Sequence, residues 1–476
     1  MKDYQANYIK LALPKGRFLP PTASLLAEID LGFESYDDKM KQYRLRSARF
    51  PSLSAKMLQE KDIPIQVAVG NYDLGICGLD WIEEFLVKYP AGALVKIAGL
   101  DYGEGGIHVV ASAQTGMISL DELSAQRKDC RIVSEYPNLA EAFALNLRMR
   151  RFRIFPVWGA AEAYPPESAD LAVLWGKSGA NIAAQGLIPL EKLLQVTAFL
   201  IANRESLENK DLSQILACFD SKLTAAELQT SIENGIDISE KLNVTRPLWK
   251  AKEINLALPD GHQQTPAAQF LKQAGLVLQG YSEEVVSRRP SADLEWLGIK
   301  VIRPQDMPLQ VANGNFDLAI TGEDWLREHL YRFPSSPVKK LFALGFGTVK
   351  IVAAVSQEMP VANIDELRSL VQSTKFAPLK VASEYINIAD HYLRDNHINP
   401  YRLIPTWGAS EAFLPEDADM LIDNVQTGKT IMQHQLKIID VLFRSSACLI
   451  ANKNSLASSD KKEKMEFLKQ KLRAGI

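Results

Sequence analysis

The sequence has few of the residues that build metal centres or disulfide frameworks. Its 476 residues include only four cysteines and six histidines. The histidines are scattered without metal-ligand spacing. The cysteines are Cys77, Cys130, Cys218 and Cys448. None of them form a CxxC pair, which argues against a zinc site or a disulfide network. Reduced thiols are typical of cytoplasmic proteins, so we expect a cytoplasmic location.

Long apolar runs and an excess of positive charge are also missing. No stretch approaches the roughly 18 apolar residues that a membrane-spanning helix needs. Residues 1–7 lack the apolar core of a secretory signal. The formal net charge is -3, which excludes the strongly basic surface typical of nucleic-acid-binding proteins. An anionic ligand would therefore need a local basic pocket.

What the sequence does contain is one internal repeat. Three of its blocks return 245, 244 and 249 residues later: 11–17 (LALPKGR) as 256–262 (LALPDGH), 70–81 (GNYDLGICGLDW) as 314–325 (GNFDLAITGEDW), and 200–203 (LIAN) as 449–452 (LIAN). The change of offset indicates one small insertion in a surface loop. Two repeats are too few for a solenoid, so we expect two globular modules that pack as a pseudo-dimer.

Each module alternates short apolar runs with helical stretches, which predicts an α/β fold with largely parallel sheets. We place the first module at 1–204, a polar helical linker at 205–252, and the second module at 253–476, where it ends in a lysine-rich helix. Glycine-rich crossings at 103–106 and 345–347 interrupt the modules, which indicates two lobes in each. Ligands in such folds bind at the carboxyl ends of strands.

The stretch 420–431 (MLIDNVQTGKTI) has the pattern of a phosphate-binding loop. A strand ends near Ile422 and a helix begins near Ile431. The residues between them would direct backbone N–H groups and hydroxyls toward a helix N-terminus, where anions bind. Asp423 is placed to bind ribose hydroxyls. The predicted phosphoribosyl-binding residues are Asp423, Gln426, Thr427, Gly428, Lys429 and Thr430. A turn followed by an ordinary capped helix would give a similar pattern.

The first module has lost this loop. Its matching stretch, 174–181 (LWGKSGAN), has Leu174 at the position of Asp423 and Asn181 at the position of Thr430. The acidic residue and one hydroxyl are therefore missing. We expect a phosphoribosyl group to bind only in the second module.

The ordered blocks of both modules resemble the ATP phosphoribosyltransferase family. In the first module these blocks are 11–17, 62–64 (DIP), 73–78 (DLGICG), 134–137 (SEYP) and 159–162 (GAAE). In the second they are 311–325, 383–385 (SEY), 408–411 (GASE), 423–430 and 446–452 (SACLIAN). The resemblance covers both modules and leaves out only the linker and the tail.

This resemblance implies two bilobal modules like the type II periplasmic-binding-protein fold. It also implies a pentosyltransferase that moves phosphoribosyl from phosphoribosyl pyrophosphate to N1 of ATP, with Mg²⁺, as the first step of histidine synthesis. Such a site acts by positioning and charge neutralisation, without a covalent nucleophile. The residues expected to bind ATP and pyrophosphate are Lys15, Arg17, Arg288, Arg303, Asp324, Ser383, Tyr385 and Glu411. Arg289 is a further basic candidate.

Several of these residues also have structural interpretations. Arg288 and Arg289 could be ordinary surface charges. Glu162 and Glu411 follow Trp-Gly turns and could cap helices. Trp81 and Trp325 are more typical of a core than of a surface that stacks on adenine.

The chain departs from the family pattern in ways that suggest one working site. The second module has Asp260 and His262 where the first has Lys15 and Arg17. The tail after Asn452 is too short for the histidine-sensing domain of the long family form, which puts feedback inhibition through this chain in doubt. We hypothesise that the second module reacts and that the first supports it, lending basic residues.

Two other functions fit the same sequence. One is a non-catalytic nucleotide-sensing regulatory protein derived from the enzyme, which the degenerate first module favours. The other is a solute-binding protein of the same fold. The expected partners are ATP, phosphoribosyl pyrophosphate, further copies of the chain and a separate regulatory subunit, with no nucleic acid.

Overall fold

The chain forms two compact units. The computed structural model describes residues 8–33, 36, 44–90, 92–115, 120, 129–149, 151–219, 252–373 and 378–476. Unit 1 comprises Met1–Pro156, Ala169–Arg246 and Thr406–Phe413, and unit 2 comprises Val157–Ser168, Pro247–Pro405 and Leu414–Ile476. Most of the predicted linker, 220–251, lies outside the described residues.

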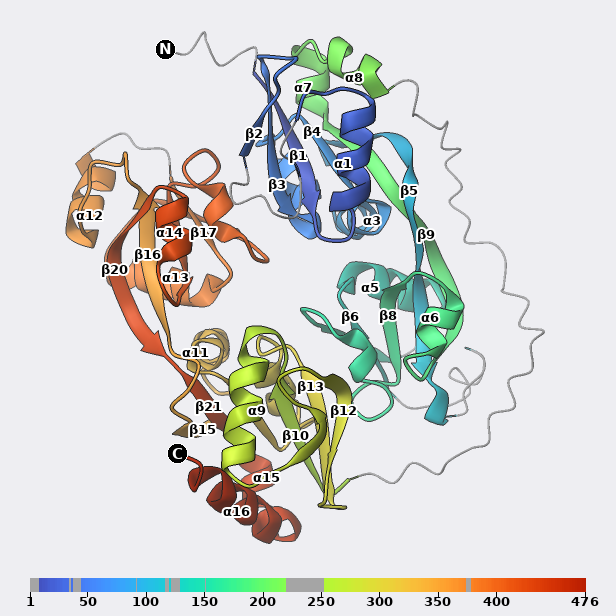
Figure 1. Cartoon of the computed structure of the whole chain (residues 1–476), viewed down its shortest axis with the longest axis vertical. Helices are drawn as coiled ribbons and strands as arrows, with labels where there is room; N and C mark the ends of the chain where they lie inside the picture. Colours follow the sequence, from blue (N-terminus) through green and yellow to red (C-terminus); the bar gives the residue numbers. More distant parts are fainter. Residues whose placement is uncertain are drawn as a thin grey trace. The chain divides into compact units, whose positions relative to one another are not determined.

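Unit 1 is built on one nine-stranded sheet (Figure 1). Its two longest strands, β5 and β9, are neighbours and pair along their length. In spatial order the strands are β2 (Arg44–Arg46), β3 (Leu53–Gln59), β1 (Ile9–Lys15), β4 (Leu74–Gly78), β9 (Leu187–Asn203), β5 (Leu94–Ser112), β8 (Leu171–Gly176), β6 (Cys130–Ser134) and β7 (Phe152–Pro156). The outer pairs are largely parallel, but β9 is antiparallel to both β4 and β5. The sheet is therefore mixed and not largely parallel as predicted.

Short helices cover this sheet with apolar faces. They are α1 (Leu19–Glu28), α2 (Ile63–Ala68), α3 (Leu79–Lys88), α5 (Pro137–Asn146), α6 (Gly179–Ala183), α7 (Arg204–Asn209) and α8 (Ser213–Phe219). Helix α1 buries Leu19, Thr22, Leu25 and Leu26. This three-to-four-residue spacing places all four on one helical face. Helices α7 and α8 occupy the start of the predicted linker.

Unit 2 contains the same elements on separate sheets. One sheet has the order β13 (Leu297–Ile302), β10 (Ile254–Pro259), β14 (Leu318–Gly322), β21 (Ala447–Asn452) and β15 (Val338–Ala343). The other has the order β18 (Tyr401–Pro405), β17 (Leu379–Ser383), β19 (Met420–Val425), β16 (Val349–Ser356) and β20 (Leu436–Ser445). A hairpin pairs β11 (Leu278–Tyr281) with β12 (Val286–Ala292).

The helices and the strand register of unit 2 repeat those of unit 1. The helices are α9 (Gln264–Gln273), α10 (Met307–Ala312), α11 (Glu323–Arg332), α12 (Ile364–Ser373), α13 (Ile386–Asp395), α14 (Lys429–Gln433), α15 (Lys453–Ala457) and α16 (Ser459–Arg473). Leu256 pairs with Leu318 as Leu11 pairs with Leu74. The duplication read from the sequence is therefore also a duplication of strand pairing, and the predicted α/β class is confirmed.

The two glycine-rich crossings take different forms. Gly345 and Gly347 lie between β15 and β16, where they separate the two sheets of unit 2 as expected. Residues 103–106 instead lie inside β5, where the pairing with β9 shifts between Leu100 and Gly105. The first crossing is therefore a bulge in a continuous strand, because β5 stays paired with β9 on both sides of it.

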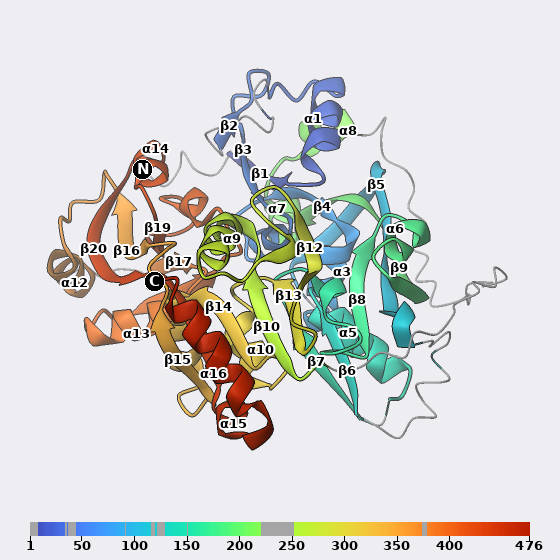
Figure 2. The ribbon, with the colours of Figure 1, turned by 60° about the horizontal axis from the view of Figure 1, so that its bottom comes forward.

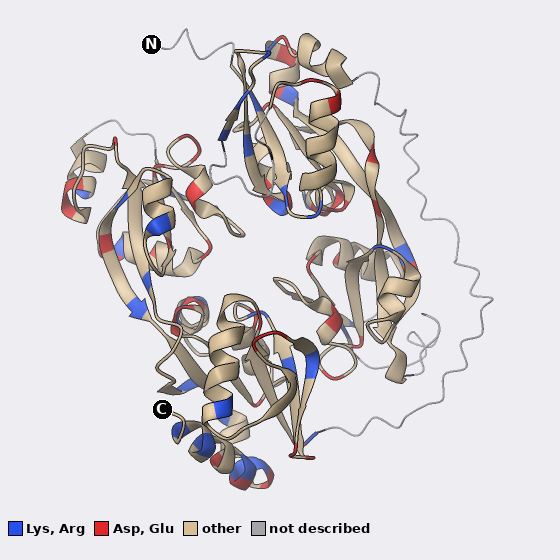
Figure 3. Cartoon of the chain, viewed as in Figure 1, with Lys and Arg blue, Asp and Glu red and all other residues tan. Residues whose placement is uncertain are grey.

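The lysine-rich helix α16 packs on the first sheet of unit 2 (Figure 2). Met465, Leu468 and Leu472 are buried in the same core as β10 and β14. Lysine and arginine side chains mark the exposed side of this helix (Figure 3). Lys461, in its first turn, forms an ion pair with the buried Asp317 at 2.7 Å. The apolar face of α16 therefore packs against the sheet, and at least one lysine outside that face forms an ion pair with the same sheet region.

Each unit includes a short segment of the other repeat. We call Val157–Ser168, which belongs to unit 2, arm 1, and Thr406–Phe413, which belongs to unit 1, arm 2. In unit 2 the Trp158 amide donates to both carboxylate oxygens of Asp306, at 3.1 Å each. In unit 1 the Lys61 ammonium lies 5.8 Å from the centre of the Trp407 ring. The predicted modules, which keep each repeat whole, differ from the units in these two segments.

Asp62 lies where arm 2 meets the rest of unit 1. It stands at the N-cap position of α2, but its side chain makes no capping hydrogen bond to the helix. Its side chain is fully buried instead. Burial raises the pKa of Asp62 to about 8, although Lys61 and the Trp407 amide lower it in part.

We predict that Asp62→Asn stabilises the protein at neutral and alkaline pH. An unfolded aspartate titrates near pH 4, so the unfolded state releases its proton first as the pH rises. The parent should then lose stability progressively between about pH 4 and pH 8, by roughly 3 kcal/mol or more. Urea unfolding at pH 5 and pH 8 should show this loss in the parent and in Asp293→Asn, an exposed control, but not in Asp62→Asn. Equal pH slopes in all three proteins would contradict the assignment.

Candidate functional site

The predicted phosphate loop of unit 2 joins β19 to α14 and is open to solvent. Strand β19 runs to Val425, beyond its predicted end, and α14 begins at Lys429. Gly428 precedes the helix with a φ of 75°, a conformation that favours glycine, and a Cβ there would meet nothing within 4 Å. Thr427 and Thr430 are both exposed. The loop can therefore bring backbone amides and hydroxyls to a ligand.

The corresponding loop of unit 1 is also exposed, but its own side chain caps the helix that follows. Ser178 stands before α6 in an extended conformation, and its hydroxyl accepts a hydrogen bond from the Asn181 amide at 3.2 Å. An N-cap of this kind satisfies an amide that an anion would otherwise bind. In unit 2 the N-cap of α14 is Gly428, which has no side chain, and the Thr427 hydroxyl makes only a 3.5 Å contact with the Lys429 amide. The difference between the two loops predicted from the sequence is thus also a difference in capping.

A hydrogen-bonded network begins beside the loop of unit 2 and ends at Asp324. Asn424 follows Asp423, and its side-chain amide donates to the Tyr385 hydroxyl at 3.1 Å. Tyr385 donates to one carboxylate oxygen of Asp324 at 2.7 Å, and Ser445 donates to the other at 2.6 Å. Burial and the carboxylates of Asp324 and Asp423 raise the pKa of Tyr385, so its hydroxyl stays protonated and continues to donate.

Ser383 holds Tyr385 in this network. The Ser383 hydroxyl donates to the Ile422 carbonyl at 2.6 Å and accepts from the Tyr385 amide at 2.9 Å. It is fully buried. Ser134 makes the same two contacts in unit 1. Ser383 therefore positions the tyrosine, and its expected contact with substrate stays a prediction.

Trp325 belongs to the core. It stacks on Tyr385 with ring centroids 4.4 Å apart, and its other neighbour is Trp158 of arm 1 at 5.8 Å. Trp81 makes the matching contact with Tyr136 at 4.4 Å in unit 1. Both tryptophans fix the orientation of a tyrosine, as the structural interpretation of these residues suggested.

In unit 1 the aspartate that corresponds to Asp324 is paired with an arginine. Arg17 contacts the fully buried Asp80 at 2.5 Å and Glu60 at 3.0 Å. Burial alone would lower the pKa of Arg17, but the two carboxylates raise it above its usual range. Burial raises the pKa of Glu60 to about 7, against the opposing effect of Arg17. The ion cluster holds the guanidinium inside unit 1.

Aromatic rings complete the enclosure of Arg17. Its guanidinium lies 4.7 Å from the ring centres of both Phe18 and Trp175. In the second repeat the positions of Arg17, Glu60 and Trp175 are occupied by His262, Pro304 and Asn424. A bulky, charged cluster therefore fills unit 1 where unit 2 has smaller or neutral groups.

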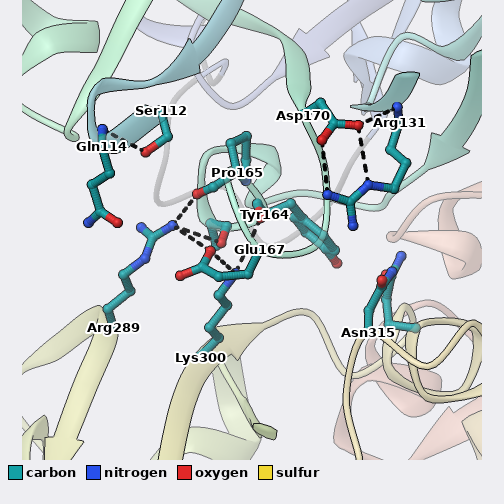
Figure 4. A network of polar contacts seen from close by, with 12 residues as sticks. Ser112, Gln114, Arg131, Tyr164, Pro165, Glu167, Asp170, Arg289, Lys300 and Asn315 are labelled. Carbon is teal, nitrogen blue, oxygen red and sulfur yellow. Dashed lines mark hydrogen bonds and ion pairs between the residues drawn. The ribbon is translucent and has the colours of Figure 1, made fainter. Parts of the chain in front are cut away.

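The predicted basic residues of unit 2 gather around Asp260. Arg288 contacts Asp260 and Glu162 of arm 1, both at 2.9 Å. Arg303 approaches Asp260 at 3.5 Å. Arg289 instead fastens arm 1, since it donates to the Pro165 carbonyl and reaches Glu167 at 3.4 Å (Figure 4). These arginines are organised by ion pairs, unlike ordinary surface charges.

The predicted residues are divided between the two units. Asp324, Ser383, Tyr385 and the loop lie in the same unit. Lys15 at the end of β1, Arg17, and Glu411 in arm 2 belong to unit 1. The engagement of Arg17 in its own ion cluster argues against lending it to the second module.

Sequence reasoning missed Asn424 and Ser445. A comparison of the two repeats could have found both residues, because the first repeat has Trp175 and Val196 at the equivalent positions. Ser445 also directly precedes the repeated block 446–452. A polar residue that replaces an apolar one beside a repeated aspartate was the available signal.

Within the described ranges, no group of three or more His, Cys, Asp or Glu side chains is arranged to hold a metal ion. The same part of the chain has no helix with the length and apolar character needed to cross a membrane.

Comparison with known proteins identifies the family. A model of the family HisG, ATP phosphoribosyltransferase, matches residues 59–221 and 303–474. It therefore matches twice and covers more than half of the sequence, and the chain belongs to the ATP phosphoribosyltransferase family.

Individual relatives match about half of the chain. The ATP phosphoribosyltransferase of Saccharolobus solfataricus is 31% identical over 230 residues, which are 47% of this chain and 73% of the relative. That of Metallosphaera sedula is 34% identical over 212 residues, 44% of this chain and 68% of the relative.

Solved structures give weaker matches. The ATP phosphoribosyl transferase (HisG:HisZ) complex from Thermotoga maritima is 21% identical, with a TM-score of 0.38, and covers 47% of this chain and 98% of that chain. The periplasmic aliphatic sulphonate binding protein SsuA from Escherichia coli is 16% identical, with a TM-score of 0.32, and covers 45% and 68%. The family assignment rests on the family model.

We predict that Arg17→Ala strongly destabilises unit 1. The substitution leaves Asp80 buried without its cation, a change that typically costs about 3–5 kcal/mol. His262→Ala removes the corresponding, exposed residue of unit 2 and is the matched control. Urea unfolding should show an early transition in Arg17→Ala alone. Identical unfolding curves for the two variants would show that the cluster does not stabilise the unit.

Proposed function

We propose that this protein is an ATP phosphoribosyltransferase with one working site, in the second repeat. The reaction would join the phosphoribosyl group of phosphoribosyl pyrophosphate to N1 of ATP and release pyrophosphate, at the start of histidine synthesis. The observation that carries the proposal is the open loop at 426–430, set between β19 and α14 in a chain of this family. The self-capped loop of unit 1 supports a single site.

The loop supplies the groups that a sugar phosphate needs. Gly428 lets the phosphate approach the backbone amides. The Thr427 and Thr430 hydroxyls add donors, and Lys429 adds positive charge. Asp423, at the end of the same strand, would accept hydrogen bonds from the ribose hydroxyls. These roles follow from residue type and location on the loop.

The Asp324 network would hold the other side of the site in a fixed geometry. Both oxygens of Asp324 accept hydrogen bonds from neutral hydroxyls, those of Tyr385 and Ser445. This carboxylate is connected to the loop through Tyr385 and Asn424. We propose that it orients the nucleotide or stabilises positive charge that develops during transfer, which requires no covalent nucleophile.

Mg²⁺ fits this site as an ion carried by the substrate. Magnesium retains several waters and binds through one or two carboxylates together with substrate phosphates. The described residues offer no larger set of ligands, and Asp423 is the carboxylate beside the loop. The ion would neutralise the charge of the departing pyrophosphate.

The free cysteines and one related structure support proposals about the location and the partners of the enzyme. All four cysteines are free and three are buried, which fits a cytoplasmic enzyme. The Thermotoga maritima structure is a HisG:HisZ complex, in which the transferase is assembled with a second protein. We propose that this chain forms homo-oligomers and accepts a separate regulatory subunit.

A non-catalytic nucleotide sensor is the second candidate. The observation that favours it is unit 1, whose own arginine and tryptophan fill the position beside Asp80. Such a protein would bind ATP or phosphoribosyl pyrophosphate without releasing pyrophosphate. The same assay separates the two functions.

We predict that Thr427→Ala/Thr430→Ala abolishes pyrophosphate release from ATP, phosphoribosyl pyrophosphate and Mg²⁺. Removing two donors from a charged transition state should lower the rate roughly 100-fold or more. Ser178→Ala/Asn181→Ala changes the matching loop of unit 1 and should retain the parent rate. A parent that binds either substrate but releases no pyrophosphate would support the sensor. Equal losses in both double variants would contradict the single site.

We also predict that Tyr385→Phe lowers turnover by about tenfold with little change in stability. The variant keeps the ring that stacks on Trp325 and loses the hydrogen bonds to Asp324 and Asn424. Tyr136→Phe makes the same change in unit 1 and should leave turnover unaltered. Steady-state kinetics with thermal unfolding as a folding control would test this. Parent activity in Tyr385→Phe would remove the network from the mechanism.

A further inference from the structure

Gln263 is a buried polar residue that has no role in the proposed mechanism. It ends the turn Gly261–Gln263, which follows β10 in unit 2. We propose that its side-chain carbonyl accepts a hydrogen bond from the 6-amino group of the adenine and thereby selects ATP by its base. The inference rests on the proposed function, because it names the residue that recognises the base in that site.

The side-chain oxygen of Gln263 has no hydrogen-bond partner. The residue is 5% exposed, and no donor reaches its Oε1 atom within the described part of the chain. A buried acceptor without a donor is uncommon, because it has lost its contact with water and gained no hydrogen bond in return. The last torsion of a glutamine side chain is broad, so the amide can turn toward an incoming group. The missing donor can therefore come from a ligand.

The amide of Gln263 lies beside the carboxylate of Asp324. Both groups converge on Gly322, since a Cβ built there would clash with Asp324 Oδ1 and would lie 3.3 Å from Gln263 Nε2. The two oxygens of Asp324 already accept hydrogen bonds from Tyr385 and Ser445. A carboxylate repels nearby phosphate groups, so the ligand group that reaches Gln263 should be uncharged and should carry a donor. Adenine has such a donor in its 6-amino group.

The first repeat has an aromatic ring at the position of this amide. Phe18 is the counterpart of Gln263, and its ring approaches Gly78 as the amide approaches Gly322. A Cβ built on Gly78 would lie 2.7 Å from the Cε2 atom of Phe18. The shared fold therefore accepts an apolar side chain at this position, and folding alone does not require the amide.

Unit 2 also leaves open the space that the Phe18 ring fills in unit 1. The strand register makes Gly347 the counterpart of Gly103, because β15 and β16 pair with β21 and β20 as the two halves of β5 pair with β9. A Cβ built on Gly103 would clash with the Phe18 ring, whereas a Cβ built on Gly347 would meet nothing within 4 Å. The exchange of a ring for an amide thus leaves room in unit 2 where unit 1 is packed.

The proposed reaction makes the 6-amino group a better donor as it proceeds. The lone pair of the adenine N1 forms the bond to the anomeric carbon of the ribose, and the electron pair of the broken bond leaves with pyrophosphate. The adenine ring then carries a positive charge that N1 shares with the 6-amino nitrogen. A carbonyl oxygen on that amino group is therefore a stronger partner in the transition state than in bound ATP. A ribose hydroxyl, which is also an uncharged donor, gains no charge in this step.

The test compares ATP with purine riboside triphosphate, an analogue that has hydrogen in place of the 6-amino group. Gln263→Met keeps the length of the side chain and removes the acceptor. With phosphoribosyl pyrophosphate and Mg²⁺, this variant should lose roughly tenfold in kcat/KM for ATP and no more than about twofold for the analogue. The ratio of the two losses isolates the amino group, because the intrinsic reactivity of the analogue affects parent and variant alike. Gln273→Met, the same change at an exposed position of α9, should leave both values unaltered.

Equilibrium binding separates this inference from the proposed activity. Calorimetric titration with ATP and with the analogue needs no turnover, and Gln263→Met should weaken the binding of ATP alone. A parent that binds ATP but releases no pyrophosphate would contradict the enzyme, and the titration would then decide the role of Gln263. Gln263→Leu repeats both measurements should Gln263→Met fold poorly by circular dichroism. Equal losses for ATP and the analogue in a folded variant would overturn the proposal, as would parent values for ATP in both measurements.

Discussion

A buried carboxylate at the first turn of a helix is the constraint from which the two units diverge. Asp80 in α3 and Asp324 in α11 are both almost inaccessible to water, and an ionised group in such a place must be satisfied from within the protein. In both units a tyrosine hydroxyl donates to this carboxylate, and to it unit 1 adds an arginine whereas unit 2 adds a serine hydroxyl. The arginine fills space and brings a positive charge, and the serine does neither.

The divergence of the two repeats is coordinated. A cationic partner for Asp80 also requires Glu60 and the flanking aromatic rings, and these positions differ together between the repeats. The same unit has lost the acidic residue and one hydroxyl of its phosphate loop, and it has gained a serine cap. The second repeat shows the converse. Its phosphate loop is open, and Asp260 stands where the first repeat has Lys15. Duplication has thus allowed each copy to lose what the other retains.

Local patterns predicted much of this structure. The offsets of the repeat gave the correct number of copies, and the alternation of apolar runs with helical stretches gave the α/β class. The phosphate loop was found because strand, glycine and hydroxyls adjoin in sequence. Whether that loop and the other chosen residues bind substrate stays a prediction.

What the sequence could not supply depends on distant partners. Residues 103–106 read as a break, yet β9, almost 90 residues later, keeps β5 continuous across them. Asp62 has the spacing of a helix cap, but arm 2 brings Trp407 toward it instead. The pairing of Arg288 with Asp260 and Glu162 joins three segments with no common local pattern.

The exchanged arms have a consequence for synthesis on the ribosome. Arm 1 emerges before any strand of unit 2 exists, and arm 2 emerges long after the other described parts of unit 1. Neither unit can therefore acquire its full set of contacts from one uninterrupted stretch of nascent chain. Unit 1 must wait, with Asp62 and its surroundings uncovered, until nearly the whole polypeptide has been made. A gene cut between the repeats would encode two fragments, each of which lacks a piece of its own fold.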